Sequence, residues 1–474
     1  MIYSQISPKL GIRYKGFGNR RYAYEVTAYW DPEKKKPRQK VRYIGIVHDN
    51  GEILKKDAKE KLTLDFGDGY LLYAFMKKAS ISHLIETVYT RKASQLLALI
   101  CYRLCYASAM RYAGHWYEGN VARFLFKGVN LSSQAISRLL KMLGDEKLKR
   151  AFFTRYITSL SHVTGGIIID TTALPNQIHL PFNAWGYHDG DIEKQIRFLF
   201  VVDSASSLPL YFRYLPGNIV DVSSLCVTVE ELARLGIHRS FVLIDAGFFS
   251  EENIRELYEK RIDFLTRLPS SRRIYKRLIK EGARTLESFE NAVRYGKRAL
   301  FITHKAIDLY GKEAYAYIIL DPERKGRETK RLLLDAIEGG DNEDIEYRLM
   351  RQGIMILVSS FAMEKADIVP LYYLRQRVEQ LFGFSKDDLQ LLPLRVHTEE
   401  TLRGYLFLMF LTLTVFMRLR QATDAKYTVE EILLIMRNLK CKTYEHHLIV
   451  HEMTKQQKEI VEKLDIIVPK KMGI

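Results

Sequence analysis

The region from residue 165 to residue 270 alternates short apolar runs with amphipathic stretches. Strands are expected where the apolar runs lie, at 165–170, 196–202, 208–214, 240–244 and 264–268. Helices are expected over 220–235 and over 250–260, where Ser250 would cap the first turn. A further apolar run at 353–358 has the pattern of a buried strand. Alternation of this kind predicts an α/β fold with a mixed sheet.

The first 61 residues predict a basic β-hairpin. Tyr22–Trp30 and Lys40–Ile46 are aromatic and β-prone, and the turn-forming stretch Asp31–Lys34 lies between them. The segment holds 15 Lys and Arg residues against 7 Asp and Glu, nearly half of the chain's excess charge. Such a hairpin could lie against phosphates, and the plain alternative is a solvated charged turn.

Residues 62–160 change to a helical pattern, with an apolar stripe over Leu96–Leu104. Within this region 131–140 resembles the turn and second helix of a helix-turn-helix, with Ser132 or Ser133 as the cap. The polar residues that would contact bases are Gln134, Ser137 and Arg138. A capped surface helix explains the same pattern equally well.

After residue 270 the chain becomes basic, with nine Lys and Arg against three Glu over 272–298. Strand-like runs follow at 300–303 and 314–320, and 321–327 reads as a charged turn. The region up to Glu346 is therefore expected to be an insertion with a small sheet of its own. Further helices are predicted at 366–388, 399–421, 428–439 and 454–463.

The composition narrows the class of protein. With 474 residues, 47% hydrophobic and 27% charged, the chain is not disordered, and a net charge of +17 suggests nucleic acid or an acidic membrane surface as partner. A basic but ordinary soluble protein is the alternative. The longest uncharged apolar run, Gly404–Met417, is shorter than the ~20 residues of a membrane span, so a buried helix and a cytoplasmic protein are expected. The four cysteines form no Cys-x-x-Cys pair, which disfavours structural zinc.

Two acidic residues stand where strongly apolar strands end. Asp170 closes the run at 165–170 and Asp245 follows the run at 240–244. A carboxylate there is unfavourable unless it faces a cleft and shares a cation with another acid. Strand ends are where open α/β sheets form their clefts. The alternative is that each Asp caps a nearby helix.

A second cluster is Tyr372, Arg375, Glu379 and Lys386. On one helix these four positions fall within an arc of about 60°, apart from an expected buried face. That buried face comprises Leu371, Leu374, Val378, Leu381 and Phe382. Glu379 would bind a cation, Arg375 and Lys386 would hold phosphate oxygens, and Tyr372 would contact DNA backbone or a base. The alternative is an Arg–Glu pair on a solvated helix face.

The spacing of this cluster is Tyr-x2-Arg-x3-Glu-x6-Lys, without a gap or a substitution. Ile168–Thr172 and Asp245–Ser250 provide two Asp blocks, with Gly186–Tyr187 and Pro216–Asp221 between them. In these motifs the chain resembles the DDE transposases of bacterial insertion sequences, in the insertion-sequence-four group. The resemblance runs from about residue 165 to residue 420.

This resemblance implies an RNase H-like catalytic core with a mixed sheet, interrupted by a β-rich insertion. It implies that Asp170, Asp245 and Glu379 are the catalytic residues and hold two Mg²⁺ ions, for which Mn²⁺ can substitute. Tyr372, Arg375 and Lys386 would then contact DNA. The expected activity is cleavage of DNA at transposon ends followed by strand transfer, on double-stranded DNA that carries terminal inverted repeats and on target DNA. A homodimer on DNA, in a bacterial cytoplasm at the nucleoid, is expected.

The implied domain layout has five parts. Residues 1–61 form the basic hairpin that contacts DNA, and 62–160 the helical DNA-binding region. Residues 161–270 and 350–420 form the catalytic core, around the basic insertion 271–349. Residues 421–474 form a C-terminal helical region with a possible role in dimerisation.

One departure concerns relatives that cut through a DNA hairpin and stack a flipped base on a Trp of the insertion. The Trp residues here lie outside it, so a tyrosine would have to stack instead. The candidates are Tyr295, Tyr310, Tyr315 and Tyr317. Two other functions remain open: a catalytically inactive DNA-binding protein of transposase ancestry, and an RNase H-like nuclease without strand transfer.

Overall fold

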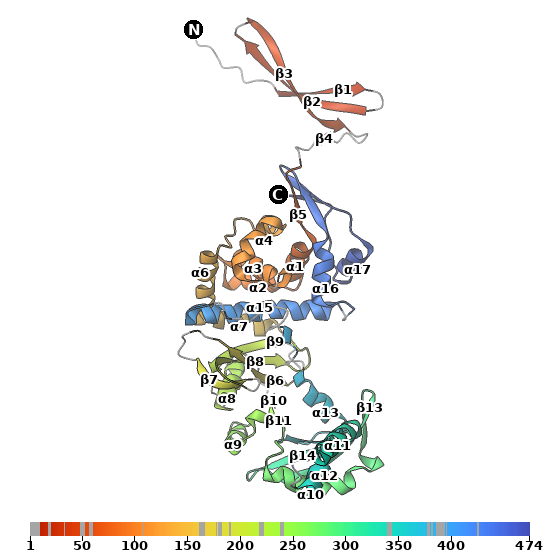
Figure 1. The fold of residues 1–474 in the computed structure, drawn as a ribbon. Helices are drawn as coiled ribbons and strands as arrows, with labels where there is room; N and C mark the ends of the chain where they lie inside the picture. The colour runs from red at the N-terminus through yellow and green to blue at the C-terminus, as the bar shows by residue number, and fades with distance from the viewer. Residues whose placement is uncertain are drawn as a thin grey trace.

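A computed structural model gives the arrangement of the chain (Figure 1). The residues that it describes are 10–17, 20–32, 34–47, 53–55, 60–106, 108–160, 166–176, 178, 183–188, 191–217, 222–237, 241–338, 344–376, 380, 383–384, 394, 396–423 and 426–474.

A ten-stranded mixed sheet carries the central part of the chain. Its strands are β6 (Ile167–Pro175), β7 (Ala184–His188), β8 (Asp191–Asp203), β9 (Pro209–Pro216), β10 (Phe241–Ile244), β11 (Asp263–Arg267), β12 (Ala292–Tyr295), β13 (Arg298–Asp308), β14 (Glu313–Leu320) and β15 (Ile354–Ser359). The order is β12-β13-β14-β15-β11-β10-β6-β8-β7, with β9 also paired to β8. β10 runs parallel to β6 and to β11, and the other pairs are antiparallel. The predicted α/β fold with a mixed sheet is confirmed.

The strands after residue 290 join this same sheet, so the expectation of a separate small sheet is wrong. β14 pairs with β15 from Tyr315↔Ser359 to Leu320↔Ile354, and β15 pairs in turn with β11. All six residues of β15 are buried, so this strand forms part of the sheet's interior. Pairing between residues that are 34–44 positions apart leaves no local signal in the sequence.

Among the described residues, six helices accompany the sheet: α8 (Val222–Arg234), α9 (Glu251–Glu259), α10 (Arg273–Leu286), α11 (Pro322–Ile337), α12 (Ile345–Met350) and α13 (Lys365–Tyr373). α8 and α9 confirm two predictions, and Ser250 caps α9 by accepting from the Asn253 N–H. The expected charged turn at 321–327 is wrong. Asp321 is instead the N-cap of α11, and Pro322 occupies its first turn, where a proline loses no hydrogen bond.

A helical layer packs on the sheet. It comprises α1 (Gly67–Lys78), α2 (Ile81–Val88), α3 (Ala93–Cys105), α4 (Ala113–Gly119), α5 (Ala122–Leu125), α6 (Ser133–Leu143) and α7 (Glu146–Ser159). The late helix α15 (Glu399–Ala422) lies between α1–α6 and the sheet, and α7 lies beside it against β9 (Figure 1). Phe407 and Phe410 of α15 contact Phe153 of α7 and Phe212 of β9, with ring centroids 5.2–6.3 Å apart. The helical layer and the sheet therefore share one aromatic core.

α15 is, within the described part of the chain, the single continuous helix long and apolar enough to cross a membrane. Its most apolar 18-residue window is 89% buried inside the protein. The prediction of a buried helix around Gly404–Met417 is confirmed.

A second sheet joins distant parts of the chain, in the order β18-β17-β16-β5. Its strands are β5 (Leu62–Asp65), β16 (Lys440–Thr443), β17 (His447–Val450) and β18 (Lys471–Gly473). Helices α16 (Val429–Arg437) and α17 (Lys455–Lys463) lie beside it. The C-terminal region, expected to be helical, thus contains three strands, and that expectation is wrong. β16 forms hydrogen bonds with β5 from the other end of the chain, and β17 and β18 extend the sheet from β16.

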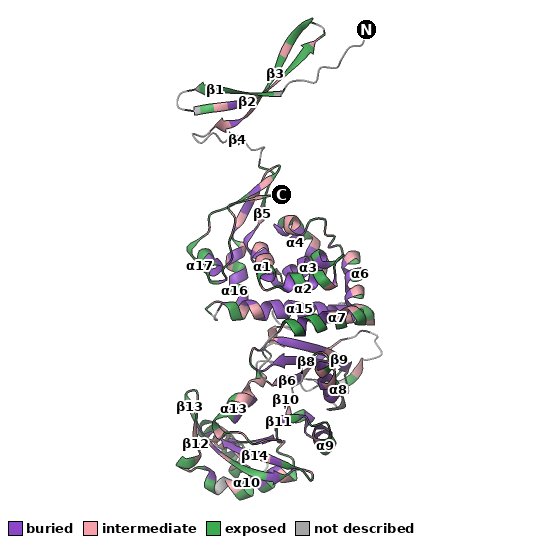
Figure 2. Ribbon diagram, turned by 180° about the vertical axis from the view of Figure 1, so that it is seen from behind, coloured by how far each residue is buried: buried purple, intermediate pink, exposed green. Residues whose placement is uncertain are grey.

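The N-terminal sheet has the order β1-β2-β3-β4, from β1 (Leu10–Phe17), β2 (Arg20–Asp31), β3 (Lys36–Val47) and β4 (Ile53–Lys55). The predicted hairpin is confirmed as β2 and β3, which pair out to Asp31↔Lys36. Figure 2 shows this sheet largely exposed, in contrast to the buried strands β8 and β9.

Candidate active site

Asp170 and Asp245 lie at the same level on neighbouring parallel strands. β10 pairs with β6 at Val242↔Ile167 and Leu243↔Ile168, and the same register continued by two residues sets Asp245 beside Asp170. Asp170 is 7% exposed within β6, whereas the Asp245 side chain, just beyond β10, is 43% exposed. The two acids are thus neighbours, but the expectation that Asp170 ends its strand is wrong, because β6 continues through the β-prone Thr171 and Thr172 to Pro175.

Arg375 joins the two carboxylates. Its Nε lies 3.5 Å from Asp170 Oδ2, and its Nη1 donates to Asp245 Oδ1. The guanidinium is 13% exposed and so occupies the place of a shared cation. Each carboxylate also accepts a backbone N–H, from Thr171 to Asp170 and from Ala246 to Asp245. The capping alternative therefore holds locally for Asp245, which caps the single 3-10 turn Ala246–Phe248, but it does not account for the convergence on Arg375.

Tyr372 stands one helical turn before Arg375, and the Arg375 Nη1 donates to its hydroxyl at 3.5 Å. Tyr372 is 8% exposed, while Leu371 and Leu374 are only half-buried. The expectation that the apolar residues form the buried face is therefore wrong for these two. The alternative of a solvated charged stripe is also wrong for Tyr372 and Arg375, because this side of the helix faces the acids of the sheet.

The rest of the cluster, Glu379 and Lys386, lies outside the described residues, as do Val378, Leu381 and Phe382 of the expected buried face. α13 ends at Tyr373, where the Leu374 N–H donates to Leu371 O in a tightened last turn. Helical residues follow at 375 and 376. Among the described residues no group of three metal-binding side chains is found. Asp170 and Asp245 supply two of the three predicted ligands.

The electrostatics of the site follow from these contacts. Burial alone lowers the pKa of Arg375, but the carboxylates of Asp170 and Asp245 outweigh burial and raise it above its ordinary value. The guanidinium is therefore charged at every accessible pH. Burial raises the pKa of Tyr372, and Asp245 adds to that effect while Arg375 opposes it. The phenol thus stays protonated and able to donate a hydrogen bond.

Sequence reasoning missed two features of this edge. The first is the bridge from Arg375 to both acids, which had been assigned to phosphate. The second is Arg267, the exposed last residue of β11. Because Ile244 pairs with Thr266, Arg267 is level with Asp245, and it lies close enough to Tyr372 to lower the pKa of that phenol. The signal would have been a cation at the end of a third parallel strand.

The candidate recognition helix forms as α6, capped by Ser132, whose hydroxyl accepts the Ala135 N–H. Gln134, Ser137 and Arg138 are exposed as predicted. The opposite side packs tightly on α15, where a Cβ added to Gly404 would lie 1.8 Å from Leu140 O.

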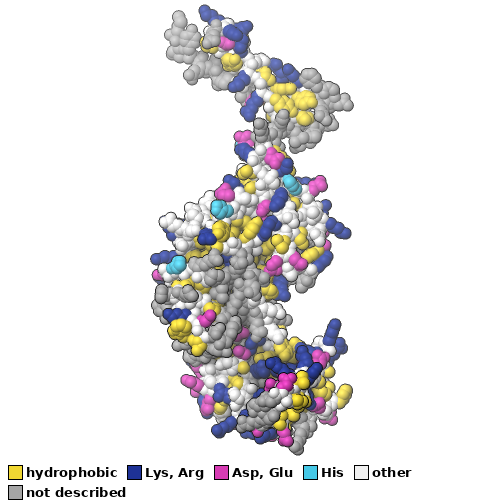
Figure 3. Space-filling view, in the orientation of Figure 1, with side chains coloured by type: hydrophobic (Ala, Val, Ile, Leu, Met, Phe, Trp, Pro, Cys, Tyr) yellow, Lys and Arg dark blue, Asp and Glu magenta, His cyan; other side chains and the backbone are white. Residues whose placement is uncertain are grey.

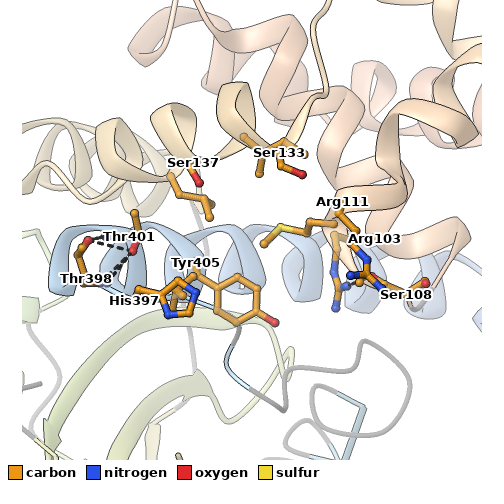
Figure 4. A pocket seen from close by; sticks show the side chains of 14 residues that line it. Arg103, Ser108, Arg111, Ser133, Ser137, His397, Thr398, Thr401 and Tyr405 are labelled. Carbon is orange, nitrogen blue, oxygen red and sulfur yellow. Dashed lines mark hydrogen bonds between the residues drawn. The ribbon is translucent and has the colours of Figure 1, made fainter. Parts of the chain in front are cut away.

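A cavity of about 520 Å³ opens beside α6 (Figure 4). Ser133 and Ser137 line it from α6, and Thr398, Thr401 and Tyr405 line it from α15. Arg103, Ser108, Arg111 and His397 complete its polar lining, and no acidic residue lines it among the described residues. Ser137, one of the three residues predicted to contact bases, thus lines a cavity with basic side chains.

The tyrosines proposed to stack a flipped base differ in accessibility. Tyr317 is fully buried and its hydroxyl donates to Met363 O, so this candidate is wrong. Tyr295 stacks on Tyr373 at 5.6 Å, and Tyr373 in turn contacts Tyr372. Tyr310 packs against Phe249. Tyr295 is therefore connected through Tyr373 and Tyr372 to Arg375.

Comparison with known proteins addresses the origin of this site. Two solved structures with similarity are "Cryo-EM structure of piggyBac transposase synaptic complex with hairpin DNA (SNHP)" and "Drosophila P element transposase strand transfer complex". The first is 11% identical and covers 84% of this chain and 79% of that chain at a TM-score of 0.41. The second is 10% identical and covers 66% of this chain and 85% of that chain at a TM-score of 0.17. Neither score is high enough to support an argument.

The comparison with curated proteins finds no match. The family model described as "Transposase DDE domain" matches residues 161–415, which is more than half of the chain and includes every residue of the proposed site. The chain therefore belongs to the family of proteins with a transposase DDE domain.

Proposed function

We propose that this protein is a DNA transposase of the insertion-sequence-four group, which cleaves DNA at the ends of a mobile element and joins those ends to target DNA. The observation that carries the proposal is the convergence of Asp170 and Asp245 on Arg375, within the matched family region. β6, β8, β9, β10 and β11 lie side by side around these acids, which is consistent with an RNase H-like core.

The donor set suits magnesium. Asp170 and Asp245 present hard carboxylate oxygens, and a single cationic group, the Arg375 guanidinium, already lies between them. Asp170, Asp245 and Glu379 would hold two Mg²⁺ ions. When bound, these ions supply Lewis-acid stabilisation of the charge that develops on the phosphodiester.

The side chains around the acids have distinct tasks in this proposal. Arg375 bridges the two carboxylates in the free protein and offsets one of their two negative charges, and it turns to a phosphate oxygen when DNA arrives, since its planar fork matches both kinds of anion. Tyr372 keeps its proton and donates to the DNA backbone. Lys386, and with it Arg267, would hold further phosphate oxygens. No protein nucleophile is required. Water hydrolyses the phosphodiester at the element's end, and the 3′ hydroxyl so freed attacks a target phosphodiester and displaces a 3′ hydroxyl of the target strand.

Recognition of the terminal repeats is assigned to α6 and the basic regions of the first 160 residues, and the protein acts as a homodimer because two ends must be paired. This work would take place in the cytoplasm of a bacterium. Phosphate contacts should make DNA binding strongly dependent on salt.

The test is metal-dependent nicking of a supercoiled plasmid that carries the element's ends, followed by joining of a pre-cleaved end to a second plasmid. Wild-type protein is expected to nick and to join only with Mg²⁺ or Mn²⁺. Asp245→Asn should bind DNA without cutting it. Asp335→Asn, which changes an exposed Asp of α11, is the matched control and should act like wild type.

Two results would overturn the proposal. If wild type and Asp245→Asn both bind DNA and neither cuts it, the chain is an inactive DNA-binding descendant. If the plasmid is nicked but no joined product forms, the chain is a nuclease without strand transfer.

A further inference from the structure

The hairpin of β2 and β3 extends beyond the rest of the N-terminal sheet. β1 pairs with β2 only as far as Thr27, and β4 pairs with β3 only at Gly45–Val47. Residues Ala28–Asp31 and Lys36–Gln39 therefore pair only with each other within the described part of this sheet. We name these two segments and the turn between them the ribbon tip. It projects from the end of the molecule (Figure 1).

One face of this ribbon carries a row of cations. Because side chains alternate along a strand, every second residue of β3 points to the same side, about 6.8 Å apart. The row consists of Lys36, Arg38, Lys40 and Arg42. Asp31 on the same face pairs with Arg38 at 3.3 Å, and Glu25 lies opposite Arg42. Lys36 and Lys40 are exposed and have no ion-pair partner among the described residues.

The turn adds to this charge, since Lys34 and Lys35 are both exposed. Figure 3 shows Lys and Arg side chains gathered over the N-terminal sheet, with few acids among them. A row of cations along one face of a narrow ribbon is complementary to a polyanion.

The ribbon tip also exposes rings. Trp30 is 61% and Tyr29 is 47% exposed, on opposite faces of β2. Val41, on the Trp30 face, is 49% exposed. Large side chains that make no core on a free-standing ribbon are typical of a surface that is covered by a partner.

We propose that the ribbon tip enters the major groove of duplex DNA, with the row of cations on the phosphates that flank the groove. Two strands lie about 4.8 Å apart, and the major groove, about 12 Å wide, admits a two-stranded ribbon with its side chains. The charge of the row selects DNA over a second copy of this basic chain as the occupant. This inference rests on the proposed function and names the part of the protein that grips the duplex outside the catalytic edge.

The experiment measures binding of the full chain to a mixed-sequence 30-base-pair duplex by fluorescence anisotropy, without metal, across a range of salt concentrations. The double variant Lys36→Ser/Lys40→Ser should bind about ten- to thirtyfold more weakly at 0.15 M salt, and its salt slope should fall by about 1.8, or roughly 0.9 for each phosphate contact. The control Lys455→Ser/Lys458→Ser removes the same charge from exposed positions of α17 and should leave the salt slope unchanged.

A second arm tests the groove. Methylation of guanine N7 blocks the major groove, so pre-methylated duplex should weaken the wild type several-fold and leave the Lys36→Ser/Lys40→Ser variant unaffected. Equal weakening of both proteins would place the groove contact elsewhere and overturn the proposal. The proposal is also overturned if the Lys36→Ser/Lys40→Ser variant binds the unmethylated duplex as tightly as wild type.

A third variant, Trp30→Ser, distinguishes a ribbon tip that binds DNA from one that binds a second copy of the chain. If it turns a dimer into a monomer without any change in DNA binding, the ribbon tip is a contact between copies and the proposal fails. Cleavage is measured apart from binding. If the Lys36→Ser/Lys40→Ser variant binds DNA like wild type and wild type cleaves DNA, the ribbon proposal is wrong and the proposed function stands. If the double variant binds DNA more weakly but neither it nor wild type cleaves DNA, the proposed function is wrong and the ribbon proposal stands.

Discussion

The ten-stranded sheet and the N-terminal sheet contain aromatic and β-branched residues in similar measure but place them oppositely. Every residue of β15 is buried, and Phe198 and Phe200 of β8 are 1–2% exposed. In the N-terminal sheet Ala23 and Gly45 are the only buried positions among the described residues of 10–47. One sheet is held by a core, and the other by its backbone ladder and by pairs such as Tyr24–Tyr43.

The difference shows where each sheet can act. In the large sheet a buried acid needs a partner. Asp203 of β8 accepts from Ser206, whereas Asp170 faces the guanidinium of Arg375, which it shares with Asp245. That shared cation marks the candidate active site. In the N-terminal sheet charge and rings lie on the surface at no such cost, so the whole face is available to a partner. The four predictions below test this contrast, from the largest effect to the smallest.

The largest effect is expected at the catalytic edge. Asp245→Asn keeps the shape of the side chain and removes the charge that metal binding requires, so DNA cleavage should fall by at least about a thousandfold. Because the Asp245 side chain is 43% exposed, the melting temperature should change little. Cleavage assays and thermal unfolding measure the two quantities. A variant that loses stability and cutting in parallel would show Asp245 to be structural.

The second prediction compares two rings. Phe410→Ala empties a 1%-exposed position of α15 between Phe153, Phe200 and Phe212, and should cost about 3–5 kcal/mol of unfolding free energy. Trp30→Ala removes a larger ring that is 61% exposed, and should change stability by less than about 0.5 kcal/mol. Urea unfolding measures both. Equal losses would mean that the N-terminal sheet has a core of its own.

The sequence predicted eight of the ten strands of the large sheet because buried strands produce apolar runs, and it pointed to the two acids because each interrupts such a run. It missed β7 and β12, whose short sequences contain no apolar run. It could not give the pairing of β14 with β15, since register between distant strands depends on tertiary packing. Asp321–Pro322 was read as a turn because the same pair of residues opens turns and helices. The sequence could not predict the role of Arg375. Periodicity correctly placed Arg375 on the same side of the helix as Tyr372, but it could not show that this side packs against the sheet.

The third prediction concerns Arg375→Gln. Removal of the guanidinium leaves Asp170 buried without a counter-charge, and should cost about 3 kcal/mol, the lower end for a broken buried pair because Asp245 can be hydrated. Millimolar Mg²⁺ should restore part of this loss, and raise the melting temperature of the variant more than that of wild type.

The matched control is Arg255→Gln, which breaks an exposed pair with Glu251 at 2.8 Å. It should cost less than about 0.5 kcal/mol and show no response to Mg²⁺. Calorimetry of wild type and of both variants, each with and without Mg²⁺, measures these differences. If Arg375→Gln proves as mild as the control, the two acids are neutralised in some other way.

The smallest expected effect lies at the ribbon tip and has the opposite sign. Asp31 pairs with Arg38 and its carboxylate accepts the Lys34 N–H that closes the turn. Asp31→Asn keeps an oxygen for the turn but removes the negative charge from the basic face, so DNA binding should become a few-fold tighter while stability changes by less than about 1 kcal/mol. Anisotropy with the mixed-sequence duplex measures the affinity. Because most surface substitutions leave binding unchanged or weaken it, a gain here would be hard to explain unless this face meets phosphates, and weaker binding would mean that Asp31 itself contacts the partner.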